Sequence, residues 1–213
     1  MIVYRDYDQA ALDAQGAKLL GSIAYTLPGQ HNPSGGMVGA YGLSGMLIED
    51  VVALVSPVHA SIPPFYFGNY MCQARPCVGN VCRNCLAVHA GTPVFNQQSS
   101  GWSTPGLRQG QGLAAATGGQ SAFDLLPGIC KRYVGGTLTT EPLWPWPMNE
   151  RIKAARVTSG LPLVDVTAQV EALLGPLPAH CRSGGEGGPT DSAPPTVTIT
   201  APSQGALISG ASV

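Results

Sequence analysis

The clearest hydrophobic pattern of the chain lies close to residue 170. Apolar residues recur there at positions i, i+4, i+7 and i+8, namely Val166, Val170, Leu173 and Leu174. This spacing places them on one face of an α-helix. Asp165 stands at the N-cap position, and Gly175 followed by Pro176 ends the pattern, because proline cannot continue a helix. We therefore predict a short amphipathic helix between Asp165 and Gly175.

A second apolar segment, residues 46–55 (MLIEDVVALV), does not follow a single period. Its β-branched residues Val51, Val52 and Val55 suit a buried strand, whereas Leu47, Val51 and Leu54 would share a helical face. Both interpretations stay open at this point. Pro57 ends the segment in either case.

Weaker patterns divide the rest of the chain. Residues 1–15 carry Tyr7 and several alanines at roughly helical spacing, which predicts a helix. Residues 90–120 are rich in Gly, Ser, Gln and Thr, with Arg108 as their only ionised side chain, so we expect loop or poor order. Residues 183–194 have the composition of a linker. From residue 195 on, apolar residues alternate with threonine, as in a half-buried strand.

Three prolines, at positions 142, 145 and 147, define a stiff extended segment that carries Trp144 and Trp146. The two rings are expected on opposite sides of the segment. One interpretation is a buried hydrophobic brace that covers the end of a domain. The other is a carbohydrate-binding platform, because flat aromatic rings stack on the apolar faces of sugars. Asn149 is expected to cap a short helix over residues 150–157.

The composition excludes several classes of function. Only 11% of the 213 residues are charged, against about 25% in typical soluble proteins. The 28 glycines and 19 prolines indicate many turns and little long helix. A net charge of −1 with scattered Lys and Arg gives no basic patch for nucleic acid or anionic lipid. The longest apolar stretch, residues 36–48, is too short to cross a membrane. Between Leu19 and Ala74 the only charged residues are Glu49 and Asp50.

A cysteine cluster is the main candidate for chemistry. Its spacing is C-x4-C-x4-C-x2-C, formed by Cys72, Cys77, Cys82 and Cys85. Four thiolates could bind Zn or an Fe–S cluster, and the last three cysteines match a plant-type [2Fe–2S] spacing. Zinc sites normally pair two such knuckles, however, and only one C-x2-C is present. Together with Cys130 and Cys181, the six cysteines would equally suit disulfides in a secreted protein, or free thiols.

The run TLTTEPLWPWPMNERIKAA and the later DVTAQVEALLG resemble a segment near the C-terminal end of secreted bacterial right-handed parallel β-helix proteins. The resemblance covers roughly residues 123–182 and implies an extracellular address, without any catalytic residue. The run APPTVTITAPSQGALISGASV, residues 193–213, resembles the opening of a bacterial immunoglobulin-like domain. Two strands cannot bury the core of such a sandwich, so we expect residues 184–213 to be poorly packed.

Residues 1–15 (MIVYRDYDQAALDAQ) resemble the N-terminus of a kynurenine formamidase-type α/β-hydrolase. The Gly-x-Ser-x-Gly elbow of that family is missing, because Gly42-Leu43-Ser44-Gly45 lacks the required spacing. The first 20 residues also lack the apolar region of a signal peptide. For a secreted protein, we therefore expect the chain to begin downstream of the biological start.

These observations predict a mixed, irregular, loop-rich fold with short helices and β segments, in which an incomplete β-rich domain precedes truncated immunoglobulin-like strands. The expected divisions are a loop-rich region with the Cys cluster (1–120), a β-helix-end-like segment with two short helices (121–182), a Gly/Pro linker (183–194) and the truncated domain (195–213). The expected function is a non-catalytic, structural or carbohydrate-associated part of a secreted or cell-surface bacterial protein, with polysaccharide as the candidate partner. The alternatives are a small Zn or Fe–S protein and a remnant α/β-hydrolase.

Overall fold

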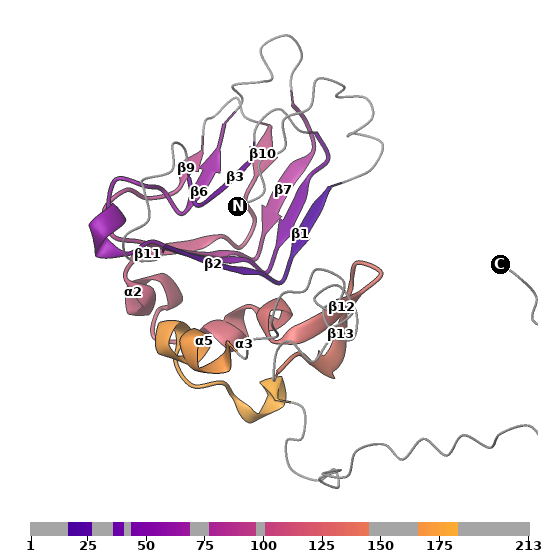
Figure 1. Ribbon diagram of the computed structural model, residues 1–213. Coiled ribbons are helices and arrows are strands. Elements are labelled where there is room, and N and C mark those ends of the chain that lie inside the picture. Colours follow the sequence, from indigo (N-terminus) through magenta and orange to yellow (C-terminus); the bar gives the residue numbers. More distant parts are fainter. Residues whose placement is uncertain are drawn as a thin grey trace, which may run out of the picture.

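The computed structural model describes residues 17–26, 36–40, 44–68, 77–96, 101–144 and 166–182. These residues form a β-rich structure with parallel sheets and a few short helices (Figure 1). The β-rich, mixed character expected from the sequence is confirmed at this level. The predicted helices at 1–15 and 150–157, the linker and the immunoglobulin-like strands lie outside the described residues.

The chain winds through three parallel sheets in successive coils, so that equivalent strands of each coil lie side by side. The first sheet contains β1 (Lys18–Leu20), β4 (Leu47–Glu49), β7 (Asn80–Arg83) and β10 (Trp102–Ser103). The second sheet contains β2 (Ile23–Tyr25), β5 (Val52–Leu54), β8 (Leu86–His89) and β11 (Arg108–Gln111). The third sheet contains β3 (Val38–Ala40), β6 (Phe65–Phe67) and β9 (Phe95–Asn96). A short 3-10 helix, η1 (Pro57–His59), follows β5.

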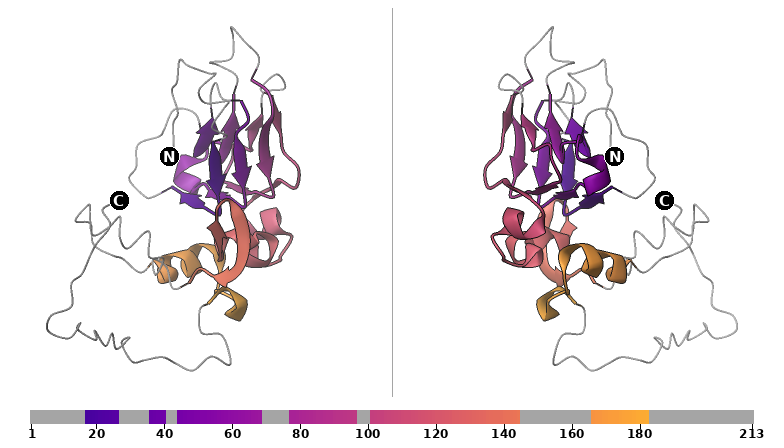
Figure 2. Two further views of the ribbon diagram at one scale, coloured as in Figure 1. Left: turned by 90° about the vertical axis from the view of Figure 1, so that its right-hand side faces the viewer. Right: turned by 90° about the vertical axis from the view of Figure 1, so that its left-hand side faces the viewer.

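The register of the coils is continuous from sheet to sheet. In the first sheet Leu47 pairs with Lys18 on one side and Val81 on the other, and in the second sheet Val52 lies between Ile23 and Leu86. Figure 2 shows the strands of the coils stacked along one direction. Equivalent positions in successive coils therefore form rows. A residue at the corner of one coil lies next to the residue at the same corner of the next coil.

The interior of the coils holds one hydrophobic cluster, here called the inner cluster. Its buried members are Val38, Met46, Ile48, Val51, Ala53, Phe65, Phe67, Cys82, Cys85 and Ala87. Aromatic rings extend it across coils, because Phe67 stacks on Trp102 with ring centroids 4.6 Å apart. The cluster consists of residues from all three sheets, so the sheets stabilise one another through a shared core.

The described residues 113–144 and 166–182, here called the C-terminal segment, cover the outer face of the second sheet (Figure 1). The segment contains α2 (Leu113–Thr117), α3 (Ala122–Leu125), η2 (Pro127–Ile129), the antiparallel hairpin β12 (Lys131–Val134) and β13 (Thr137–Pro142), α5 (Thr167–Leu174) and η3 (Ala179–Cys181). Its apolar side chains join Val52, Leu54, Leu86 and Val88 in an outer cluster. The central strands β5 and β8 are thus buried on both faces, which suits continuous rather than alternating apolar runs, whereas β11 is mostly exposed.

The ambiguous segment 46–55 proves to be two strands, β4 and β5, separated by a corner at Asp50. The expectation of loop over residues 90–120 is wrong for β9, β10, β11 and α2. These strands form because each pairs with the edge strand of the preceding coil. Their own sequences are polar and show little alternation of apolar and polar residues. Close packing also fixes Gly110, where an added Cβ would lie 2.8 Å from the Cα of Ala116 in α2.

The predicted C-terminal helix is confirmed as α5, which ends at Gly175 with φ of 90°. Val166 is the residue before its first turn and makes no side-chain cap, while Asp165 lies outside the described residues. None of the helices in the described ranges is long and apolar enough to cross a membrane.

Candidate functional site

The corners between the first and second sheets form a row of residues with left-handed backbone. Gly21, Asp50, Asn84 and Gly106 have φ values of 53°, 53°, 49° and 69°. Asp50 and Asn84 are the only described non-glycine residues with positive φ. Short polar side chains tolerate this conformation because they form local hydrogen bonds. The corners are also linked by backbone bonds, such as the amide of Asp50 donating to the carbonyl of Arg83 at 3.3 Å.

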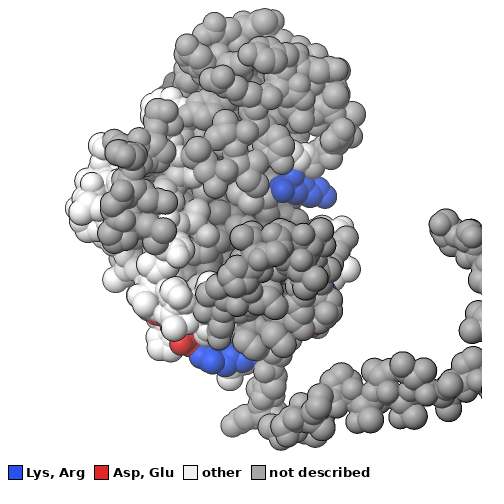
Figure 3. Space-filling view, in the orientation of Figure 1, with Lys and Arg blue, Asp and Glu red and all other residues white. Residues whose placement is uncertain are grey.

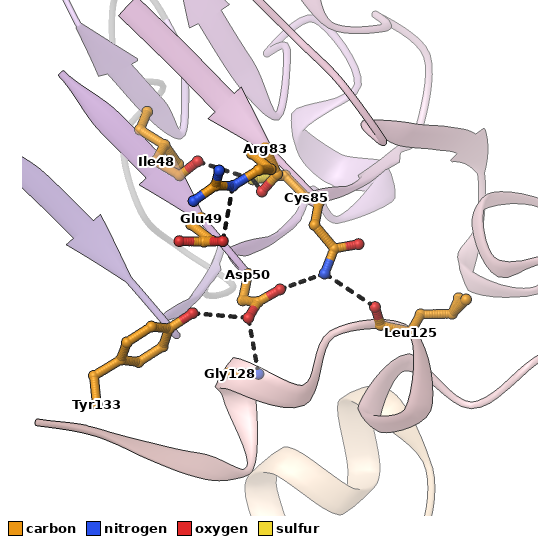
Figure 4. Close-up of polar contacts among 9 residues, drawn as sticks. Ile48, Glu49, Asp50, Arg83, Cys85, Leu125, Gly128 and Tyr133 are labelled. Carbon is orange, nitrogen blue, oxygen red and sulfur yellow. Dashed lines mark hydrogen bonds and ion pairs between the residues drawn. The ribbon is translucent and has the colours of Figure 1, made fainter. Parts of the chain in front are cut away.

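The Asp50 carboxylate is the centre of a buried polar cluster (Figure 4). Only 3% of the residue is exposed. The amide of Asn84 donates to its Oδ1, while the backbone N–H of Gly128 at 3.0 Å and the hydroxyl of Tyr133 at 2.8 Å donate to its Oδ2. Asn84 also donates to the carbonyl of Leu125 at 3.2 Å. The cluster therefore joins two coils to the C-terminal segment across 78 and 83 positions of sequence.

Close backbone approach is required for this arrangement. A Cβ added to Gly128 would lie 2.6 Å from the Cβ of Asp50 and 2.7 Å from the hydroxyl of Tyr133. A Cβ added to Gly21 would lie 3.0 Å from the carbonyl carbon of Gly128. Such distances are shorter than van der Waals contact. Glycine at both positions lets η2 and the hairpin lie directly against the corner row.

The surroundings of Asp50 keep the hydroxyl of Tyr133 in its neutral, protonated form. Burial, followed by the hydrogen bond to Asp50, raises the pKa of Tyr133 above its ordinary value. The Tyr133 hydroxyl therefore stays a donor at neutral pH and does not act as a base. Nearby, Arg83 donates to Glu49 at 2.8 Å in a solvent-exposed ion pair. Because both oxygens of Asp50 accept hydrogen bonds, its carboxylate serves as an anchor for the groups around it.

A disulfide between Cys130 and Cys181 closes the C-terminal segment, with both residues fully buried. Beside the disulfide, the backbone amide of Leu143 donates to the carbonyl of Cys130 at 2.7 Å. His180 lies near both sulfurs, so these three residues have the proximity of a metal site. The disulfide bond uses both thiols, however, and His180 lies 3.4 Å from the Asp124 carboxylate.

The predicted four-cysteine metal site is not assembled in the described residues. Cys77 is disulfide-bonded and therefore has no thiolate to offer a metal. Cys82 and Cys85 are free but belong to the inner cluster, and Cys72 lies outside the described residues. The hydrogen bond to Cys85, together with burial, raises the pKa of the Cys82 thiol. Because metal binding needs thiolates, the raised pKa of Cys82 in an apolar interior disfavours a metal ligand at that residue.

The extended tryptophan segment is described only at Trp144. This residue is 4% exposed, and its indole N–H donates to the carbonyl of Ile129 at 3.3 Å. Its ring belongs to the outer cluster and does not present a face to solvent for a sugar. Trp146 lies outside the described residues, so the two-ring platform stays untested as a pair. The burial of Trp144 agrees with the alternative expectation of a hydrophobic brace.

The residues that the sequence did not single out are Asn84, Gly128 and Tyr133. Asp50 itself gave one signal, since it and Glu49 are the only charges between Leu19 and Ala74. Its partners lie 34 to 83 positions away, and no local pattern connects them. A scan against protein-family models and searches of the curated proteins and the solved structures each found no match.

Proposed function

We propose that this chain is a non-catalytic structural part of a secreted or cell-surface bacterial protein, forming the C-terminal end of a right-handed parallel β-helix. The order of the strands carries the proposal. Three sheets of parallel strands in continuous register support it, because successive coils of a β-helix produce this topology. The C-terminal segment then has the role of sealing the outer face of one sheet.

The state of the cysteines supports an extracellular address. A buried disulfide that spans 51 positions persists in oxidising compartments and is rare in the cytosol. Cys77 is disulfide-bonded as well. On the face shown in Figure 3, few charged side chains appear among the described residues.

The polar cluster supports a structural rather than a catalytic role. Asp50 is the only buried carboxylate in the described ranges. Its oxygens accept from three donors, and the raised pKa of Tyr133 keeps that hydroxyl a donor rather than an activated nucleophile. The arrangement connects the coils to the C-terminal segment through hydrogen bonds. Trp144 does not support binding of a polysaccharide, because its ring is buried and cannot stack on a sugar.

The experiment compares the chain exported to an oxidising bacterial periplasm with the same chain made in a reducing cytoplasm. Hydrogen exchange is measured by mass spectrometry over β5, β8 and α5. The proposal expects slow exchange in all three elements of the exported protein and faster exchange of the reduced protein, beginning in the C-terminal segment. A Cys130→Ser/Cys181→Ser variant exported in the same way is the matched control and is expected to behave like the reduced chain.

Equal protection of the exported, reduced and variant proteins would contradict the extracellular structural role. Protection confined to the hairpin, with rapid exchange in β5 and β8, would contradict the stacked parallel sheets themselves. Both readouts are independent of any ligand or substrate.

A further inference from the structure

A cavity of about 500 Å³ lies between the first coil and the C-terminal segment. Strand β2 and its preceding corner form one wall, and η2, β12 and the start of α5 form the other. Its volume lies within the range of about 300–1,000 Å³ that is typical of small-molecule sites. The structural role proposed above does not use this space.

The cavity wall is mainly apolar. Leu20 and Ile23 contribute from the first coil, and Ile129, Leu143 and Val170 contribute from the opposite side. Tyr25, Tyr133 and Trp144 add aromatic surface. The Tyr133 hydroxyl is already used by Asp50, and the Trp144 indole N–H is used by Ile129. A ligand therefore meets these aromatic residues through their apolar parts, which suits a hydrocarbon body.

The charged residues of the described cavity lining have one sign. Lys131 and Arg132 line the cavity, and its described lining contains no Asp or Glu. Arg132 contacts Glu141 through one terminal nitrogen at 2.5 Å, while its Nε is buried and has no hydrogen-bond partner among the described residues. Lys131 forms no ion pair with any described acidic residue. An anion at this edge would be attracted by the Lys131 ammonium and by the Arg132 guanidinium, which has further N–H donors besides the one that contacts Glu141.

We propose that this cavity binds an amphiphilic carboxylate, with its aliphatic chain along the apolar wall and its head group at Lys131 and Arg132. Each part of the ligand follows from one part of the wall. A fully polar ligand would leave its hydroxyl groups unpaired against Ile23, Ile129 and Val170. A neutral hydrocarbon would leave the cationic side unused. The planar carboxylate matches the geometry of a guanidinium group and accepts from an ammonium group at the same time.

The test uses the full oxidised chain and decanoate below its aggregation concentration. Isothermal titration calorimetry measures affinity and stoichiometry, and NMR locates the ligand through contacts between its methylene protons and the methyl groups of Ile23 and Val170. We expect saturable binding of one decanoate, with those contacts present. Decan-1-ol, which has the same chain without the charge, is expected to bind about tenfold more weakly.

A pair of lysine variants separates the site from general electrostatic attraction. Lys131→Met removes the charge from the cavity wall and is expected to weaken decanoate binding about tenfold while leaving decan-1-ol unchanged. Lys18→Met, on strand β1 and outside the lining, is the matched control and is expected to bind like the natural chain.

Three results would overturn the proposal: no saturable binding, equal effects of the two lysine variants, or contacts that map away from Ile23 and Val170. The NMR contacts are measured on the natural chain, so the proposal is decided even where a variant changes folding. None of these results bears on the structural role, which the exchange experiment tests separately.

Discussion

The substitution Asp50→Asn tests whether the buried polar cluster fastens the coils to the C-terminal segment. Asn is nearly isosteric and tolerates the φ of 53° at this corner, so backbone strain does not confound the result. The change replaces one accepting oxygen by an NH₂ group. That group must face either the Asn84 amide or the donors of Gly128 and Tyr133.

The expected loss follows from the number of donors affected. A hydrogen bond to a charged group contributes about 1.5–3 kcal/mol, and a buried donor left without an acceptor costs about 1–3 kcal/mol. These contributions share one acceptor and are not additive. We therefore expect Asp50→Asn to lower the free energy of unfolding by about 2–4 kcal/mol, a large part of the stability of a small domain.

Urea unfolding followed by circular dichroism measures this loss. Asp124→Asn is the control, because Asp124 has 59% of its side chain exposed and its ion pair among the described residues is with His180, so its removal should change stability by less than about 0.5 kcal/mol. Tyr133→Phe removes one donor, and the double variant with Asp50→Asn should show a coupling energy of about 1 kcal/mol or more. A loss at Asp50 no larger than that at Asp124, with no coupling to Tyr133, would refute the fastening.

Three further outcomes are expected. Cys130→Ser/Cys181→Ser should lower stability by about 4 kcal/mol, because the disulfide spans 51 positions and constrains the unfolded chain; urea unfolding of the oxidised and variant proteins measures it. Alkylation in denaturant without reductant should modify Cys82 and Cys85, and a chelator should not change the count; mass spectrometry of the digested chain would contradict this if either residue were blocked. The pKa of Tyr133 in the folded protein is raised above its unfolded value near 10, so the stability that Tyr133 contributes is complete below pH 10 and decreases as the pH rises further. Between pH 9 and 11.5, urea titrations should therefore show a smaller loss of stability for Tyr133→Phe than for the natural chain.

Helix α5 could be predicted from the sequence because one of its faces packs on the core and the other meets solvent. Val170 and Leu174 are buried in the outer cluster, and the intervening positions are more exposed. An amphipathic element carries its period in its own residues. Gly175 at the end of the helix could be predicted for the same reason, because the positive φ needed there depends on that one residue and not on distant contacts.

The segment 46–55 shows why the coils could not be predicted in the same way. Ile48 faces the inner cluster, Asp50 forms a corner, and Val52 faces the outer cluster. The corner breaks the alternation, and both faces of β5 are buried, so polar residues do not mark a solvent side. Residues 108–111 are the opposite case, because their polar side chains form a strand only where β8 supplies a parallel partner.

The burial of β5 on both faces links the inner and outer clusters energetically. Val51 and Ala53 contact the inner cluster, while Val52 and Leu54 contact the outer one, so β5 cannot shift without disturbing both. Asp50 immediately precedes these residues and holds Gly128 of the C-terminal segment. The polar cluster thus fixes the register between two apolar surfaces that would otherwise tolerate sliding, since apolar contacts are not directional. In this chain directionality comes from the buried carboxylate of Asp50 and from the hydrogen bond of Asn84 to the Leu125 carbonyl, and these bonds align the apolar surfaces.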